Sequence, residues 1–269
     1  MIKALPFAAQ ESKCLEDINS PFYRDPVTRK NILPWELRVL AVRLQGIGFG
    51  DARRGIAGYY DLAKDARHEI TRTEDKEERR IWKERLKDLG VRVGNALIEF
   101  GDLPAALRQF ENLRTNANEE DDVLLQTRIA LLYLHLGDTT AASRYIPTPN
   151  TSLLPPLLSM AEGRYDTAIA QWQTLLEAPT HAPNTALLSQ NLALCHLYTN
   201  NVVEAHALLD SLVEKGRSFH ALTFNLATVY ELCSEKARAK KGELAERVAK
   251  SVVGEGRKGG ERVGADFKL

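Results

Sequence analysis

The chain has little of what most small secreted or membrane proteins depend on. Only three cysteines occur among its 269 residues, too few and too scattered for a disulfide framework or a zinc site. No apolar run reaches the ~18 residues of a membrane-spanning helix. The first ten residues lack the basic start and apolar core of a signal peptide. We therefore expect a cytoplasmic protein with no direct membrane insertion.

An excess of either charge is also missing. Lys and Arg together number 36, as do Asp and Glu, so the formal net charge is zero. A neutral chain gives no global electrostatic reason to bind nucleic acid or an anionic membrane, and we expect neither. Hydrophobic residues make up 44% and charged residues 27% of the chain, which is ordinary for a folded protein.

Motifs that carry chemistry are equally scarce. The glycine-rich stretch Gly46–Gly50 follows no predicted strand and precedes no Gly-Lys-Ser/Thr, so it reads as a helix–helix turn. The six histidines lack metal-ligand spacing; His196 and His206, for example, stand ten residues apart. No Ser/His/Asp or Cys/His arrangement is recognisable. We expect no metal, no cofactor and no catalytic activity.

What the chain does contain is a repeated turn followed by a small residue. The turns follow apolar segments with helical spacing, and they are Gly101-Asp102, Gly137-Asp138, Gly163-Arg164 and Asn200-Asn201. An alanine stands five residues after the start of each turn, at Ala106, Ala142, Ala168 and Ala205. A large apolar residue follows four positions later, as Phe110, Ile146, Trp172 or Leu209. Two less regular units place Gly55 and Ala239 at the small position.

This pattern resembles the tetratricopeptide (TPR) repeat, whose period is ~34 residues with two helices per unit. The small residue fits where the two helices of a hairpin cross most closely. The glycine or asparagine of the turn tolerates the left-handed backbone that ends the first helix. One hairpin cannot bury its own apolar face, so hairpins must stack. We predict an all-α fold, a TPR-type solenoid forming a right-handed superhelix of about five to six hairpins.

Composition divides the chain into three parts. Residues 1–33, which contain Pro21 and Pro26, read as an irregular segment. Residues 34–251 should form the TPR-like α-solenoid. Residues 252–269 form a glycine-rich tail that we expect to be disordered.

Three helices of the solenoid are predicted less regularly than the rest. The first should begin at Pro34, and its leucines have helical spacing at Leu37, Leu40 and Leu44. The charged stretch 64–89 is predicted as one long helix that continues to Phe100. Prolines between 147 and 156 leave room for only a brief helix, roughly 157–161.

The first helix of each TPR hairpin lines the concave surface, which gives a candidate protein-binding groove. Counting back from the turns, its residues are Leu124, Thr127, Leu131, Leu134, His135, Leu187, Gln190, Leu194 and Leu197. Chaperone-type TPR domains use cations here to bind a terminal carboxylate, but Val91, Thr127 and Gln190 stand at those places. The groove is therefore predicted to take an apolar or helical segment. The alternative is that some of these leucines are core between helices.

The N-terminal part carries a more specific resemblance. Its segments are Pro21–Arg29, Ile32–Leu40, Phe49–Gly55 and Tyr59–Ala63. With the repeats behind them, they resemble the C-terminal TPR region of the subunit 12 family of the transport protein particle (TRAPP), in its fungal form. The resemblance implies a non-catalytic subunit of a vesicle-tethering complex in endoplasmic reticulum-to-Golgi traffic and autophagy. Its partners would be the other protein subunits, which would hold it peripheral to those membranes.

Two classes of function therefore compete. The chain is either a fixed scaffold subunit of such an assembly or a transient TPR adaptor that captures short peptides, as co-chaperones do. The missing clamp cations and the apolar inward positions favour the scaffold.

Overall fold

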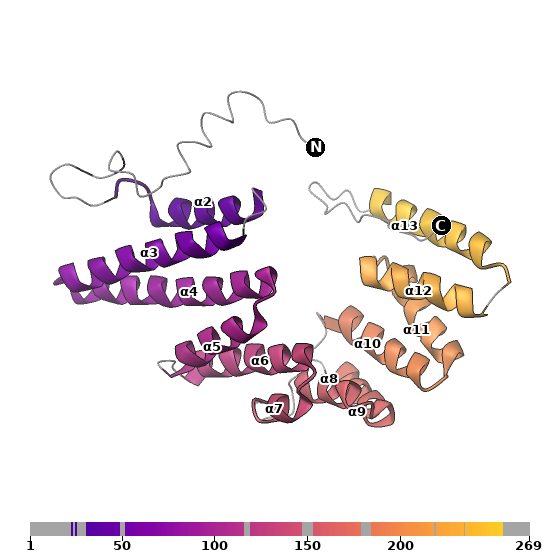
Figure 1. The fold of residues 1–269 in the computed structure, drawn as a ribbon. Coiled ribbons are helices and arrows are strands. Elements are labelled where there is room, and N and C mark those ends of the chain that lie inside the picture. Colours follow the sequence, from indigo (N-terminus) through magenta and orange to yellow (C-terminus); the bar gives the residue numbers. More distant parts are fainter. Residues whose placement is uncertain are drawn as a thin grey trace. The chain divides into compact units, whose positions relative to one another are not determined.

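In the part of the chain that the structure describes, helices form all the long regular elements (Figure 1). The computed structural model describes residues 23, 25, 31–48, 52–115, 119–146, 153–178, 184–217, 219–233 and 235–254. Within these residues there are twelve α-helices and no β-strand. Most of the predicted segments 1–33 and 252–269 lies outside the described residues, so their expected irregularity stays a prediction, and residues 252–254 belong to the last helix.

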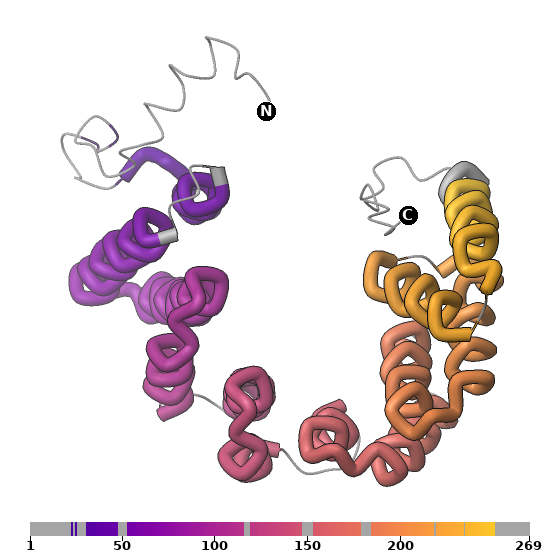
Figure 2. Tube along the Cα trace, turned by 45° about the vertical axis from the view of Figure 1, so that its right-hand side comes forward, coloured from indigo at the N-terminus to yellow at the C-terminus, as the bar shows by residue number. Residues whose placement is uncertain are grey.

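The helices pair in chain order into six hairpins. They are α2 (Trp35–Gly48) with α3 (Ala52–Arg72), α4 (Lys76–Phe100) with α5 (Leu103–Arg114), α6 (Glu119–Leu136) with α7 (Thr139–Ser143), α8 (Leu154–Ala161) with α9 (Tyr165–Glu177), α10 (Thr185–Tyr198) with α11 (Val202–Glu214), and α12 (His220–Cys233) with α13 (Ala237–Gly254). The predicted all-α fold of TPR-type hairpins is confirmed. The chain divides into two compact units, residues 1–132 and 133–269. In unit 1 the helices from α2 to α5 lie side by side in chain order, and in unit 2 the helices from α8 to α13 do (Figure 2).

Four of the predicted turns share one backbone structure. Gly101, Gly137 and Gly163 have φ of 88°, 81° and 74°, and Asn200 has φ of 64°. In the first turn, the Gly101 amide donates to the Ile98 carbonyl and the Asp102 amide to the Leu97 carbonyl, both at 3.0 Å. The other three turns repeat this pair of bonds with the corresponding residues. The pattern is a Schellman cap, which satisfies carbonyls that the helix end would otherwise leave bare.

The predicted small residues lie where helices meet. Ala106, Ala168 and Ala205 are 0% exposed and Ala142 is 1% exposed. At Gly55, a Cβ would lie 3.1 Å from the Cα of Gly46, so α2 and α3 touch through their backbones at this point. Such an approach is open to glycine because it has no side chain.

The last hairpin corrects the expected repeat register. Ala239 is exposed, and the helix begins one residue later than the pattern assumed. Lys240 occupies the place of the small residue, and Leu244, 0% exposed, that of the large one. The Lys240 ammonium lies 5.4 Å from the centre of the Tyr230 ring, a favourable cation–π contact. A lysine fits because its stem lies along apolar surface while its charge stays near water.

Three helix boundaries also differ from expectation. The stretch from 64 to 100 is two helices, because α3 ends at Arg72 and α4 begins at Lys76. Asp75 caps α4 by accepting hydrogen bonds from the amides of Glu77 and Glu78. Helix α8 begins at Leu154 with its prolines in the first turn, where a missing amide hydrogen does no harm. Helix α7 ends at Ser143, so Ile146 lies beyond it.

Each unit has its own core. In unit 1, α2, α3 and α4 bury Val42, Leu62 and Leu89 among others. Arg38 is only 4% exposed and pairs with Asp65. In unit 2, Trp172 of α9 is fully buried, and its indole nitrogen donates to the Met160 sulfur at 3.3 Å. A second cluster in unit 2 joins α10 to α13 and includes Leu209, Leu222, Leu226 and Leu244.

Candidate protein-binding surfaces

The predicted groove residues are partly surface and partly buried. On α6, Leu124 is 62% and Leu131 43% exposed, and on α10 Leu187 is 47% exposed. His135 is exposed, whereas Thr127, Leu134, Leu194 and Leu197 are half-buried and Gln190 is buried. Leu197 also packs against the core of unit 2. Three leucines are therefore free to meet a partner, while Gln190 belongs to the packing between helices.

An apolar stripe on α2 is exposed as well, and the sequence did not show that this stripe faces away from the core. Leu37, Leu40, Leu44 and Ile47 are 42%, 52%, 52% and 59% exposed. They recur at the three- and four-residue spacing that places side chains on one helix face. The helix turns its other face, including Val39 and Val42, to the core. The leucine spacing that predicted α2 therefore lies on its exposed face. The glycine-rich stretch after the helix did not indicate which face would be exposed.

The charges beside the α2 stripe are already paired within the protein. Both guanidinium nitrogens of Arg43 donate to the Glu99 carboxylate, at 2.6 and 2.8 Å, and Glu36 pairs with Arg85 at 3.3 Å. The hydrogen bonds from Arg43 hold the pKa of Glu99 below its ordinary value. A partner on this stripe would accordingly meet apolar side chains rather than free charges.

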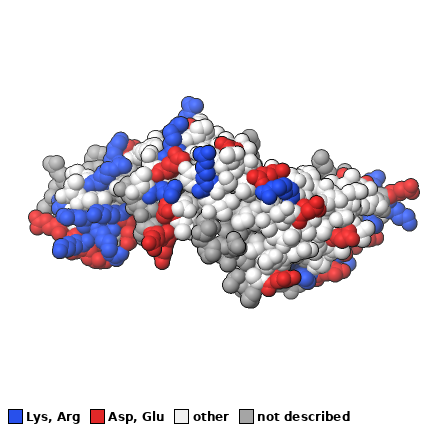
Figure 3. Space-filling model, turned by 90° about the horizontal axis from the view of Figure 1, so that it is seen from below, with Lys and Arg blue, Asp and Glu red and all other residues white. Residues whose placement is uncertain are grey.

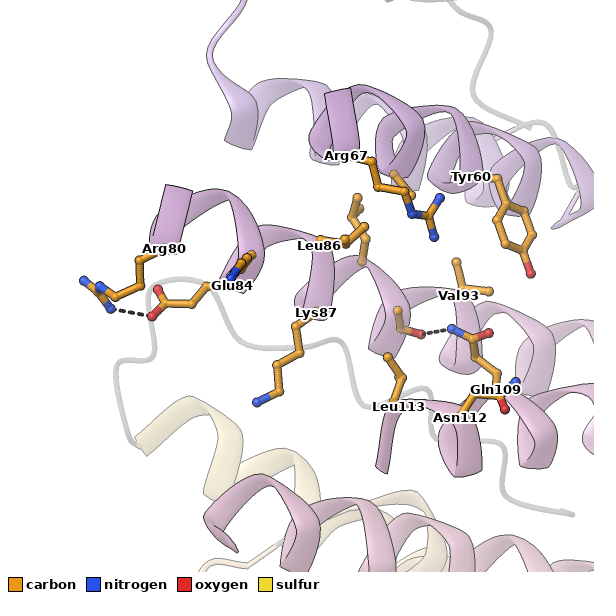
Figure 4. Close-up of a pocket in the computed structure, with 14 residues that line it drawn as sticks. Tyr60, Arg67, Arg80, Glu84, Leu86, Lys87, Val93, Gln109, Asn112 and Leu113 are labelled. Atoms are coloured by element: carbon orange, nitrogen blue, oxygen red, sulfur yellow. Dashed lines mark hydrogen bonds and ion pairs between the residues drawn. The ribbon is translucent and has the colours of Figure 1, made fainter. Parts of the chain in front are cut away.

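A cleft of about 710 Å³ opens in unit 1 between α3, α4 and α5 (Figure 4). Its floor is apolar and includes Ala63, Leu86, Leu89, Val93 and Leu113. The sequence did not predict this cleft, because three helices from two hairpins build it and no single helix carries its pattern.

Glycine brings α5 close to α4 at one end of the cleft. A Cβ on Gly90 would lie 2.5 Å from Cδ2 of Leu113, and one on Gly94 would lie 2.5 Å from two atoms of the Phe110 ring. The Gln109 side-chain amide donates to the Gly90 carbonyl at 3.2 Å, a bond drawn in Figure 4. Helix α5 has 12 residues against 25 for α4, so the earlier turns of α4 extend beyond it and leave the cleft open.

The rim of the cleft is mostly cationic. Arg67 comes from α3, and Arg80, Lys83 and Lys87 come from α4, with Glu84 as the acidic member. Arg80 bonds to Glu77 and Glu84, which lowers the pKa of Glu77, and Lys87 pairs with Asp121 of α6. Figure 3 shows charges of both signs crowded at the end of unit 1 that carries the α3–α4 turn.

Groups suited to chemistry are dispersed. Over the part of the chain that the structure describes, no three His, Cys, Asp or Glu side chains converge on a possible metal position. Cys195 is buried beside Trp172, and burial raises the pKa of its thiol to about 11. His206 packs on the Tyr230 ring at 5.5 Å. Among the described helices, none is long and apolar enough to cross a membrane.

Comparisons with known proteins agree with the hairpin architecture. A family model described as a tetratricopeptide repeat matches residues 158–231. The crystal structure of a tetratricopeptide repeat protein from Parabacteroides merdae superposes with a TM-score of 0.55 at 13% identity, covering 91% of this chain and 94% of that one. This likeness is one of fold alone, a fold whose members typically bind other proteins.

Two curated relatives are trafficking proteins. The chain is 25% identical over 187 residues to the Trafficking protein particle complex subunit 12 of Homo sapiens, covering 63% of this chain and 25% of that protein. It is 24% identical over 164 residues to the Mus musculus protein of the same name, covering 58% of this chain and 17% of that protein. The match thus spans a quarter or less of each relative.

Proposed function

We propose that this chain is a non-catalytic scaffold that serves as a subunit of a TRAPP-type vesicle-tethering complex. Its counterpart would be the C-terminal TPR region of subunit 12, in the fungal form, and it would act in endoplasmic reticulum-to-Golgi traffic and autophagy. The proposal rests on the curated relatives together with one structural observation, the exposed apolar stripe of α2. In this role the chain is cytoplasmic and reaches membranes only through its complex.

The α2 stripe has the properties of a stable interface. Its four side chains are each 42–59% exposed. Burying their remaining exposed area against a partner would contribute on the order of 3–6 kcal/mol to binding, at the usual free energy per buried side chain. Their spacing matches the anchors that helix-in-groove partners use. Since the neighbouring charges are paired within the protein, association here should depend little on salt.

The candidate groove residues supply further apolar contacts within each unit. Leu124, Leu131 and Leu187 belong to first helices of hairpins, the helices on which TPR proteins build their concave surface. The absence of clamp cations at Val91 and Thr127, which are half-buried rather than buried like Gln190, argues for an apolar partner segment rather than a peptide carboxylate. A transient adaptor remains the alternative, and the identity of the partners separates the two.

The test is affinity purification of the full chain from its native cells, followed by mass spectrometry. Wild type should co-purify with other subunits of a tethering complex, and Leu40→Ser/Leu44→Ser should lose most of them. Leu232→Ser/Val203→Ser is the control, because these apolar residues are 70% and 78% exposed on other helices. Circular dichroism establishes that all variants are folded.

The outcomes separate the parts of the proposal. If chaperones co-purify and no tethering subunit does, the adaptor function replaces the scaffold. If the α2 variant keeps every partner and a Leu124→Ser/Leu131→Ser variant loses them, the interface is the groove and not α2.

A further inference from the structure

The cleft between α3, α4 and α5 is a surface that the scaffold role does not use. It is built from helices other than α2, α6 and α10, which carry the surfaces described above. Its volume of about 710 Å³ falls within the range of pockets that bury a ligand or an anchor side chain. A site here would act independently of docking on α2.

The shape of the cleft follows from unequal helix lengths. Helix α4 is roughly 37 Å long and α5 roughly 18 Å, at 1.5 Å per residue. The close contacts at Gly90 and Gly94 fix α5 against the second half of α4, so the cleft lies along the turns of α4 that precede Gly90. Because α3 and α5 both pack against α4, the walls of the cleft are held in place.

The floor and the rim of the cleft favour different chemical groups in a ligand. Leu86 and Leu113 are partly exposed and offer an apolar floor, which favours a large apolar side chain. Four of the five charged residues at the rim are cationic. Within the described residues, neither Arg67 nor Lys83 has an ion-pair partner or a side-chain hydrogen bond. An acidic group would therefore be attracted to the rim on both sides of the cleft.

One carboxylate already occupies the edge of this rim. Lys87 pairs with Asp121, which belongs to an acidic first turn of α6 that also holds Glu119, Glu120 and Asp122. The cations of the cleft thus bind carboxylates from the protein itself where a helix brings them near. Nucleic acid is less well matched, because a phosphate backbone makes no use of an aliphatic floor and Tyr60 is the one aromatic lining residue among those described.

We propose that this cleft binds an acidic amphipathic segment of a partner protein, with a large apolar side chain seated on Leu86 and Leu113 and carboxylates paired with Arg67 and Lys83. The segment lies across the earlier turns of α4, as an amphipathic helix does in an apolar groove.

Fluorescence anisotropy with a defined probe tests this. The probe is a labelled synthetic helix of ~16 residues with leucine at the i, i+3, i+4 and i+7 positions and glutamate elsewhere. Wild-type full-length protein should bind it, and Arg67→Glu/Lys83→Glu should weaken binding about tenfold or more. The matched control is Arg72→Glu/Lys76→Glu, which makes the same charge change on the same two helices outside the cleft and should leave affinity within about twofold.

Four results would overturn the inference. They are no binding of the probe to wild type, an equal loss in the control variant, equal binding of a peptide with serine in place of leucine, and tighter binding of an RNA of matching charge. Leu40→Ser/Leu44→Ser should bind the probe as wild type does. A failure of the scaffold proposal is therefore distinguishable from a failure of this one.

Discussion

Replacing Gly94 with alanine tests how closely α4 and α5 are packed. An alanine normally stabilises a helix interior relative to glycine by about 1 kcal/mol. At Gly94, however, the new methyl group would lie 2.5 Å from Cε1 and Cζ of Phe110, a ring that is 0% exposed. Because the ring is fully buried and two of its atoms lie within 2.5 Å of the added methyl group, overpacking should cost about 2–3 kcal/mol. The net expectation is a destabilisation of about 1–2 kcal/mol.

Gly242 provides the matched control. It lies inside α13, is exposed, and has no atom within 4 Å of an added Cβ. Gly242→Ala should therefore show the propensity gain alone and stabilise its hairpin by about 0.5–1 kcal/mol. The same chemical change is thus expected to have opposite signs at the two positions.

Urea unfolding followed by far-ultraviolet circular dichroism measures both variants, and hydrogen exchange of the α4 and α13 amides assigns each change to its hairpin. A second variant, Gly94→Ala/Phe110→Leu, removes the clash and should destabilise less than the sum of its single changes. The packing described here is refuted if Gly94→Ala is as stable as wild type or more stable, or if the double variant shows no coupling.

Two further predictions use burial in the same way. Ala205→Asp should destabilise the protein by about 2–5 kcal/mol, because it places an unpaired charge at a fully buried position, whereas Ala239→Asp should stay within about 0.5 kcal/mol in thermal melts. Destabilisation by Ala239→Asp as large as that by Ala205→Asp would refute the register given for the last hairpin, and a stable Ala205→Asp would refute the burial of Ala205. In a Cys14→Ser background at pH 8, Cys233 is exposed and should react with a thiol reagent, while Cys195 is buried with a thiol pKa of about 11 and should not. Modification of both thiols in the folded protein, followed by mass spectrometry, would contradict that burial.

The repeat could be predicted from the sequence because it depends on residues that lie close together in the chain. A left-handed turn followed by a buried alanine needs only residues within one hairpin, so Gly101 with Ala106 and Asn200 with Asn201 and Ala205 could be located without a structure. The last hairpin was predicted with its register one residue off, because a lysine stands at its small position. The break between α3 and α4 was not predicted, because charged residues on both sides of Asp75 continue the helical pattern.

The binding surfaces were harder to predict than the fold. Helical spacing locates an apolar face but does not tell whether a neighbouring helix covers it. Leu37, Leu40 and Leu44 therefore predicted a helix, but not that their face would be exposed. The cleft depends on the different lengths of α4 and α5 and on contacts at Gly90, which join residues 23 positions apart along the chain (90 and 113). Such a surface exists only once the hairpins are stacked.

The repeated caps have a consequence for how this chain changes in evolution. Each turn is held by two hydrogen bonds that lie within six successive residues, and it requires a positive φ rather than one particular side chain, as Asn200 demonstrates. Duplication or loss of a whole hairpin therefore leaves every remaining cap with its own partners. Related chains should differ in length mainly by steps near ~34 residues, with the insertions beginning and ending between hairpins rather than inside them.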